Sequence, residues 1–236
     1  MQQWIEYGPA YALATVQLAP GESVVAEAGA MVSMTPGIEV QTSSGAAGGG
    51  VLGGLKRSML GGESFFMNTF TAQADSQISF APSAPGDIVH WELQGQNVLL
   101  TSGAFLFCTN GIGVDTKWGG AKTFFSKEGL FLLRVGGTGS LFISSYGAIK
   151  QVDLQPGQHY TVDTGHVVAF GEGVGYSVRK FGGWKSTFFG GEGLVVDLTG
   201  PGPVWIQTRS AQSFAGWIAP FLPTQSSGPA AFSFGS

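Results

Sequence analysis

The chain contains 236 residues, of which 39 are glycine and 11% are charged, against about 7% and about 25% in average proteins. A hydrophobic content of 43% excludes disorder, glycines without a period of three exclude collagen, and scarce helix formers argue against a helical bundle, which leaves an all-β protein. The net charge of −4 argues against a general nucleic-acid-binding protein, which needs a basic surface.

The N-terminal residues show no basic segment followed by an apolar one, so no signal peptide is predicted. No uninterrupted apolar stretch reaches the ~18 residues of a membrane helix. We therefore expect a cytoplasmic protein. The single cysteine, Cys108, allows no intrachain disulfide, and we interpret it as a small buried hydrophobic residue.

Three segments share one spacing of glycines. A glycine opens each segment, a second follows eight residues later, and a third follows after eight more. The apolar residues between them predict short strands separated by tight turns. The three sets are Gly21, Gly29 and Gly37; Gly95, Gly103 and Gly111; and Gly157, Gly165 and Gly173.

A second pattern follows each glycine set: a Gly-Gly-x-Lys stretch, a glutamate six or seven residues after the lysine, and then two apolar strands. The lysines are Lys56, Lys122 and Lys185, and the glutamates are Glu63, Glu128 and Glu192. The predicted strand pairs are 64–71 with 77–80, 130–135 with 139–144, and 194–198 with 203–208.

Together the two patterns predict three repeated β-sandwich units of about 65 residues in a pseudo-threefold arrangement. The units span 1–86, 87–150 and 151–210, and a tail occupies 211–236. A glycine-rich insertion, 43–54, interrupts the first unit. Units this small are marginal alone, so we expect them to pack edge to edge, share a core and cover one another's strand edges.

The repeated lysines and glutamates are the polar constellation that stands out from this charge-poor background. If the units are related by a pseudo-threefold axis, these six side chains form a ring. One interpretation is an ion pair or interface contact at each junction between units. The other is a ring that binds an anionic ligand, RNA or a lipid headgroup.

No motif for catalysis or metal binding is recognisable. His159 and His166 are seven residues apart and His90 is distant in sequence, which does not match a cupin-type metal site. A G-x-S-x-G elbow and a phosphate-loop spacing are both absent. We therefore expect no enzymatic activity and no cofactor, and an enzyme that uses one of the histidines remains an alternative.

The tail after residue 210 contains a short apolar helical face that Pro220 ends. We expect this face to pack onto the sandwich, and contact with a membrane is the alternative. The residues of the face are Phe214, Trp217, Ile218, Phe221 and Leu222.

Four segments resemble the mitochondrial-biogenesis family named for altered inheritance of mitochondria, whose bacterial branch was formerly a domain of unknown function. They are residues 28–39, the glycine-rich run into 55–57, residues 61–72 and residues 198–210, and the resemblance extends over about residues 10–223. It implies a fold similar to the tryptophan RNA-binding attenuation protein, in which short double-stranded β-helix units form rings. It also implies a homotrimer and, in the fungal branch, a role in organising the mitochondrial inner membrane.

The hypothesis that follows is a non-enzymatic, ring-forming scaffold with an unidentified protein partner. The alternative is a binding module for RNA or an anionic small ligand that uses the lysine ring. The tryptophan-pocket and RNA-contacting motifs of the attenuation protein are not recognisable, so neither activity is carried over with the fold.

Overall fold

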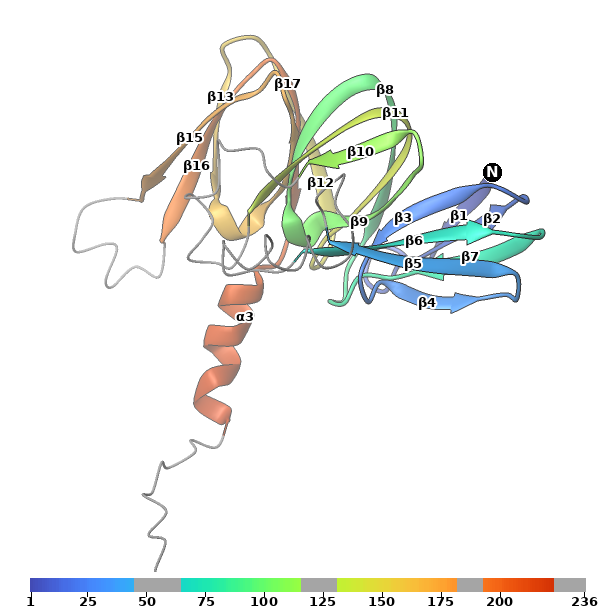
Figure 1. Ribbon diagram of the computed structural model, residues 1–236. Coiled ribbons are helices and arrows are strands. Elements are labelled where there is room, and N and C mark those ends of the chain that lie inside the picture. The colour runs from blue at the N-terminus through green and yellow to red at the C-terminus, as the bar shows by residue number, and fades with distance from the viewer. Residues whose placement is uncertain (45–64, 116–130, 182–192, 223–236) are drawn as a thin grey trace, which may run out of the picture.

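The computed structural model describes residues 1–44, 65–115, 131–181 and 193–222. In these ranges the protein is built from β-strands and ends in one short α-helix, α3 (Ala211–Ile218), which confirms the predicted all-β class (Figure 1). The strands are β1 (Gln2–Glu6), β2 (Leu13–Leu18), β3 (Ser23–Glu27), β4 (Met31–Met34), β5 (Ile38–Ser44), β6 (Phe66–Ala72), β7 (Ser76–Phe80), β8 (Ile88–Thr101), β9 (Phe105–Thr109), β10 (Ile112–Asp115), β11 (Leu132–Ser144), β12 (Ile149–Leu154), β13 (His159–Asp163), β14 (Val167–Gly171), β15 (Gly175–Lys180), β16 (Leu194–Thr199) and β17 (Gly202–Gln207).

In the first region of the chain, residues 1–86, two central strands each pair with two neighbours. Strand β7 pairs with β2 and β4, and strand β6 pairs with β3 and β5, all antiparallel. Strand β1 adds to the outer edge of β2. The third region has the same arrangement, because β17 pairs with β12 and β14 while β16 pairs with β13 and β15.

The middle region makes the same four pairings with fewer, longer strands. The first half of β8 pairs with the second half of β11, which also pairs with β9. The second half of β8 pairs with the first half of β11, which also pairs with β10. The sequence predicted separate strands at 130–135 and 139–144, whereas the structure has a continuous β11 with a register shift between Gly136 and Thr138. A bulge therefore replaces the expected turn.

The glycine that opens each set lies in left-handed backbone conformation. Gly21, Gly95 and Gly157 have φ angles of +85°, +96° and +75°. A side chain at these positions would be strained, so the recurrence of glycine has a local cause. Residues at the same distance from these glycines are called equivalent below.

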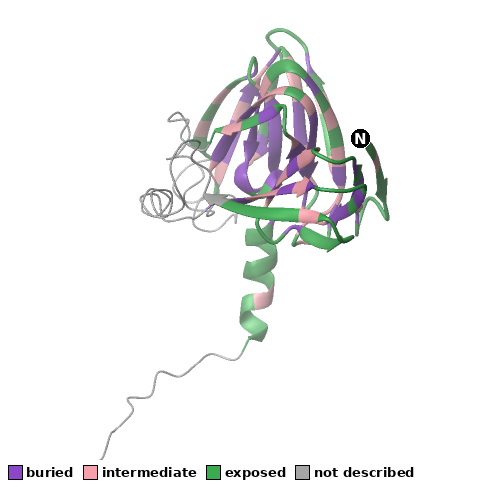
Figure 2. Ribbon diagram, turned by 45° about the vertical axis from the view of Figure 1, so that its right-hand side comes forward, coloured by how far each residue is buried: buried purple, intermediate pink, exposed green. Residues whose placement is uncertain are grey.

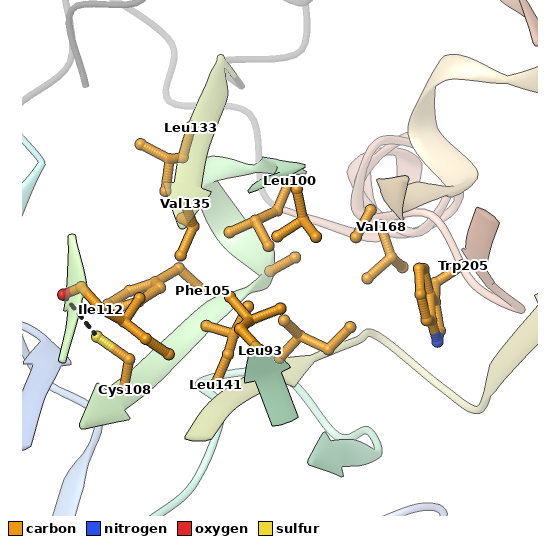
Figure 3. Close-up of a cluster of buried hydrophobic side chains, with 14 of the residues drawn as sticks. Leu93, Leu100, Phe105, Cys108, Ile112, Leu133, Val135, Leu141, Val168 and Trp205 are labelled. Carbon is orange, nitrogen blue, oxygen red and sulfur yellow. Dashed lines mark hydrogen bonds between the residues drawn. The ribbon is translucent and has the colours of Figure 1, made fainter. Parts of the chain in front are cut away.

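The apolar side chains form three clusters, and each cluster includes residues from more than one region of the chain. Figure 3 shows the largest, in which Leu93, Phe105 and Leu141 of the middle region pack with Val168 and Trp205 of the third. The Trp205 ring lies 3.9 Å from that of Trp91. Burying side chains across the boundaries couples the three regions, because each cluster loses apolar contacts if a neighbour separates.

Candidate functional site: two open strand edges

Two junctions join the three regions, and both are antiparallel strand pairs. At the first junction β9 pairs with β3, and Val25 lies opposite Cys108. At the second junction β14 pairs with β8, and Leu99 lies opposite Phe170. Val25 and Leu99 are equivalent, and so are Cys108 and Phe170. The two junctions therefore have the same strands, direction and register.

Strand β4 is the equivalent of β9 and β14, but within the described chain it pairs only with β7. Its side chains are exposed along the whole strand, whereas β9 and β14 are buried over their first four residues. The contrast is sharpest eleven residues after the opening glycine, where Val32 is 56% exposed while Leu106 and Val168 are fully buried.

Strand β13 is the equivalent of β3 and of the second half of β8, and it is the other strand that lacks the junction partner of its equivalents. Within the described residues it pairs only with β16. Thr161 is exposed, whereas its equivalent Leu99 is 2% exposed. At both junctions an equivalent of β4 pairs with an equivalent of β13. In the described chain β4 and β13 themselves have no such partner.

The order of strands in the sheets shows the same two missing pairings. Two arrays of six strands run across the junctions, in the orders β12-β17-β14-β8-β11-β10 and β8-β11-β9-β3-β6-β5. The remaining strands form two half arrays, β2-β7-β4 (with β1 outside) and β13-β16-β15. In Figure 1 these half arrays lie on opposite sides of the molecule. An unpaired strand edge presents free backbone donors and acceptors that can bind another strand.

A cluster of polar side chains forms hydrogen bonds across the second junction at the protein surface. Glu172, in the turn after β14, accepts hydrogen bonds from Arg134 at 2.7 Å and from Asn97 at 2.8 Å. The hydrogen bond from Arg134 is the main cause that lowers the pKa of Glu172 below its usual value. The cluster is partly exposed, so salt and solvent weaken it.

The first junction has a partly buried carboxyl group instead. Burial raises the pKa of Glu27, at the end of β3, to about 7. Its equivalent at the second junction, Thr101, donates to the carbonyl oxygens of Val167 and Val168 across the junction. Glu27 directly follows Ala26, the last β3 residue paired with β9, and desolvation there disfavours the charged form.

The open edge of β13 carries polar side chains that bond within its own sheet. Thr161 donates to Asp197 at 2.6 Å, and Asp197 also accepts from Arg179. His159 lies 3.1 Å from the hydroxyl of Thr199. These side-chain contacts occupy the face of the sheet and leave the outer backbone edge of β13 without a strand partner in the described chain.

The six residues of the predicted Lys/Glu ring all lie outside the described residues: Lys56, Lys122, Lys185, Glu63, Glu128 and Glu192. Most of the glycine-rich insertion, from residue 45 onward, lies outside them as well. Cys108 is fully buried, as predicted, and burial raises the pKa of its thiol to about 12. A thiol with such a pKa is a poor nucleophile at neutral pH.

The three histidines have separate surroundings. His90 stacks on Phe142 at 4.9 Å, and His166 lies 2.7 Å from the carbonyl oxygen of Gln207. In the part of the chain that the structure describes, no group of three or more His, Cys, Asp or Glu side chains is arranged to hold a metal ion.

Helix α3 does not pack onto the sandwich, contrary to the expectation from the sequence. It has no buried residue, and Figure 2 shows it projecting from the body of the protein. Phe214 contacts Tyr146 at its base, while Trp217 is 65% exposed. None of the helices in the described ranges is long and apolar enough to span a membrane.

Sequence reasoning did not identify the open edges. Met31–Met34 is as apolar as many core strands, so its composition gives no sign of exposure. The available signal was the alignment on Gly21, Gly95 and Gly157, which makes β4, β9 and β14 equivalent. β9 and β14 each pair with a strand of the region before them, and the described chain holds no such strand for β4.

Comparisons with known proteins agree with the resemblance seen in the sequence. The family described as Mitochondrial biogenesis AIM24 matches residues 4–209. An uncharacterized protein of Streptococcus pyogenes serotype M6 is 31% identical over 231 residues, covering 96% of this chain and 93% of that protein. The crystal structure of a Streptococcus pyogenes protein is similar with a TM-score of 0.79 and 29% identity, covering 94% of this chain and 99% of that chain.

Proposed function

This chain belongs to the mitochondrial biogenesis AIM24 family, and from that premise we propose that it is a non-enzymatic protein that assembles with copies of itself into a ring and serves as a scaffold. In this proposal the chain consists of three repeated units, at 1–86, 87–150 and 151–210. Each unit is a short sandwich like that of the tryptophan RNA-binding attenuation protein.

The pattern of strand pairing supports the proposed repeat. Four antiparallel pairings occur in each of the three regions, and they involve equivalent strands each time. Three unrelated segments would not be expected to have the same strand connectivity, whereas three copies of one repeated unit would. The terminal units of such an array have one uncovered side each.

The two open edges are the observation that carries the proposed self-assembly. One chain contains two half arrays, with β4 at the edge of one and β13 at the edge of the other. At both internal junctions, an equivalent of β4 pairs with an equivalent of β13. A head-to-tail contact between copies would complete a third six-stranded array. Because the contact is head to tail, it leads either to a closed ring or to an open filament. The family resemblance favours a ring, with a homotrimer as the expected size.

A scaffold in this sense is a rigid ring that holds other molecules in place. We propose that it works in the cytoplasm with a protein partner, and that any membrane link in the manner of the family passes through α3. The helix carries Phe214 and Trp217 on its surface, and the 3-10 helix that follows it (Ala219–Phe221) carries the exposed Phe221. Aromatic side chains favour the membrane interface. Flotation with vesicles, with and without residues 211–236, tests this link.

The alternative function, binding of RNA or an anionic ligand, depends on the six ring residues that lie outside the described ranges. None of the contacts in the described chain favours it.

Native mass spectrometry tests the proposed assembly. The wild-type protein at micromolar concentration is expected to give a discrete multiple of the 24.5 kDa chain. Val32→Lys, which places a charge on the open edge of β4, is expected to give monomers. Val40→Lys is the matched control, because Val40 is an exposed valine of β5, which is neither of the two strands of the proposed contact. A wild-type protein that is monomeric would overturn the proposal.

A further inference from the structure

Resting on the proposed self-assembly, we propose a specific joint between copies. Strand β13 of one copy pairs antiparallel with β4 of the next, in the register that places Thr161 opposite Met34. The neighbouring pairs in this register are Tyr160 with Thr35 and Val162 with Ser33. The partner is a second copy of this chain, recognised by its backbone edge and by apolar side chains.

The register follows from the two junctions inside the chain. At the first, Val24, Val25 and Ala26 lie opposite Thr109, Cys108 and Phe107. At the second, Val98, Leu99 and Leu100 lie opposite Gly171, Phe170 and Ala169. Replacing each residue by its equivalent in β13 and β4 gives the three proposed pairs.

Strand β4 already has the shape that the joint requires. Its pairing with β7 skips one residue, Val32, between Met31 and Ser33. The pairing of β9 with β11 skips the equivalent Leu106, and the pairing of β14 with β17 skips the equivalent Val168. A bulge bends its strand and redirects the side chain there. The same bend recurs in a strand with no partner on its outer edge, so no rearrangement is needed for pairing.

The packing inside the chain indicates where Val32 goes. Leu106 and Phe107 are buried in the cluster of the first region, together with Phe142. Val168 and Ala169 are buried in the cluster of the middle region, together with Trp205. Each bulged strand thus inserts into the core of the region before it. By equivalence, Val32 would be buried in the cluster of the third region of the adjacent copy, beside Val162 and Leu198.

The side chains at the proposed joint are more polar than those of the internal junctions. Ser33 and Ser79 are the equivalents of Phe107 and Phe142, by position and by strand pairing. Thr161 replaces Leu99. A less apolar joint suits an edge that must also face water before assembly, because a long apolar edge would aggregate.

Disulfide cross-linking tests the register. In Thr161→Cys/Met34→Cys the two thiols of adjacent copies would face each other across the strand pair, and mild oxidation is expected to give covalent multimers on a non-reducing gel. The matched control, Thr161→Cys/Ser33→Cys, moves one thiol to the opposite face of β4 and is expected to give none. A second pair, Tyr160→Cys/Thr35→Cys, guards against a local effect of one substitution.

The outcomes separate this inference from the proposed function. Covalent multimers from both matched pairs and none from the control support the joint. If native mass spectrometry shows a multimer while neither matched pair cross-links, the register is wrong and self-assembly still stands. If the protein is monomeric, both proposals fail.

Discussion

Strands β9 and β4 have the same pairing, the same bulge and opposite surroundings. Both pair antiparallel with the last strand of their own region, and both skip the residue eleven positions after the opening glycine. Yet Leu106 is fully buried and Val32 is 56% exposed. The difference lies in the neighbour, since β9 lies against β3 and β4 has no described neighbour on that side. Local sequence specifies the strand and its bulge, and the presence of an adjacent unit determines burial.

The largest expected difference between the two strands is in thiol reactivity. Cys108 and Met34 are equivalent, and the pKa of the buried Cys108 thiol is raised to about 12. In Met34→Cys, an exposed thiol with a pKa of about 8.5 is expected to react more than about a thousandfold faster with a thiol reagent in monomers. Labelling rates followed by mass spectrometry measure this. Equal rates at the two sites would contradict the assigned burial.

Truncating the side chain at the bulge is expected to lower the free energy of unfolding much more in β9 than in β4. Leu106→Ala is expected to lower the free energy of unfolding by about 2–5 kcal/mol, because it leaves a cavity in a packed core. Val32→Ala is expected to cost less than about 1 kcal/mol in monomers and to weaken assembly instead. Urea denaturation at several protein concentrations distinguishes them. A large, concentration-independent loss for Val32→Ala would show that β4 is not an open edge.

The partly buried carboxyl group of Glu27 at the first junction predicts an effect of pH on stability. The pKa of Glu27 is raised from 4.5 to about 7 in the folded protein by desolvation. Between these values the folded state holds a proton that the unfolded state has lost, so stability falls as pH rises from about 4.5 to 7. Glu27→Gln is expected to stabilise the protein at pH 8 by no more than about 3 kcal/mol, with little effect at pH 4. A stabilisation that is the same at both pH values would argue against a raised pKa at Glu27.

The smallest effect is expected at the second junction, where the pKa of Glu172 is lowered mainly by Arg134. A lowered carboxyl pKa gives stability that is present above its unfolded value of about 4.5 and is lost as pH falls through the folded pKa. Glu172→Gln is therefore expected to cause a small loss at neutral pH that disappears in high salt or at low pH. Thermal melts at two salt concentrations measure it, and a large, salt-independent loss would indicate a structural role beyond this pair.

Much of the fold could be predicted from the sequence because glycine marks its turns. Gly21, Gly95 and Gly157 occupy left-handed turns, and the apolar runs after them form the expected strands. The predicted strands at 194–198 and 203–208 agree closely with β16 and β17. The continuity of β8 and β11 was not predicted, because glycines within a strand mark a bulge as well as they mark a turn.

The candidate site could not be found in the same way. The sequence drew attention to matched charges, whereas the open edges are defined by backbone groups, which every residue carries. Cys108 was recognised as buried because it sits in an apolar run, but Met31–Met34 is exposed although three of its four residues are apolar. Burial at such positions depends on contacts between regions, and a local pattern does not contain that information.

Hydrogen exchange of the backbone amides tests the central claim most directly. Exchange in β4 and β13 would be compared between the assembled wild-type protein and monomeric Val32→Lys, with β9 and β14 as internal references. The account predicts that the amides of residues 31–34 and 159–163 that point away from β7 and β16 exchange quickly in the monomer and become as protected in the assembly as those of β9 and β14. Exchange in β4 and β13 that is unchanged by assembly would contradict it.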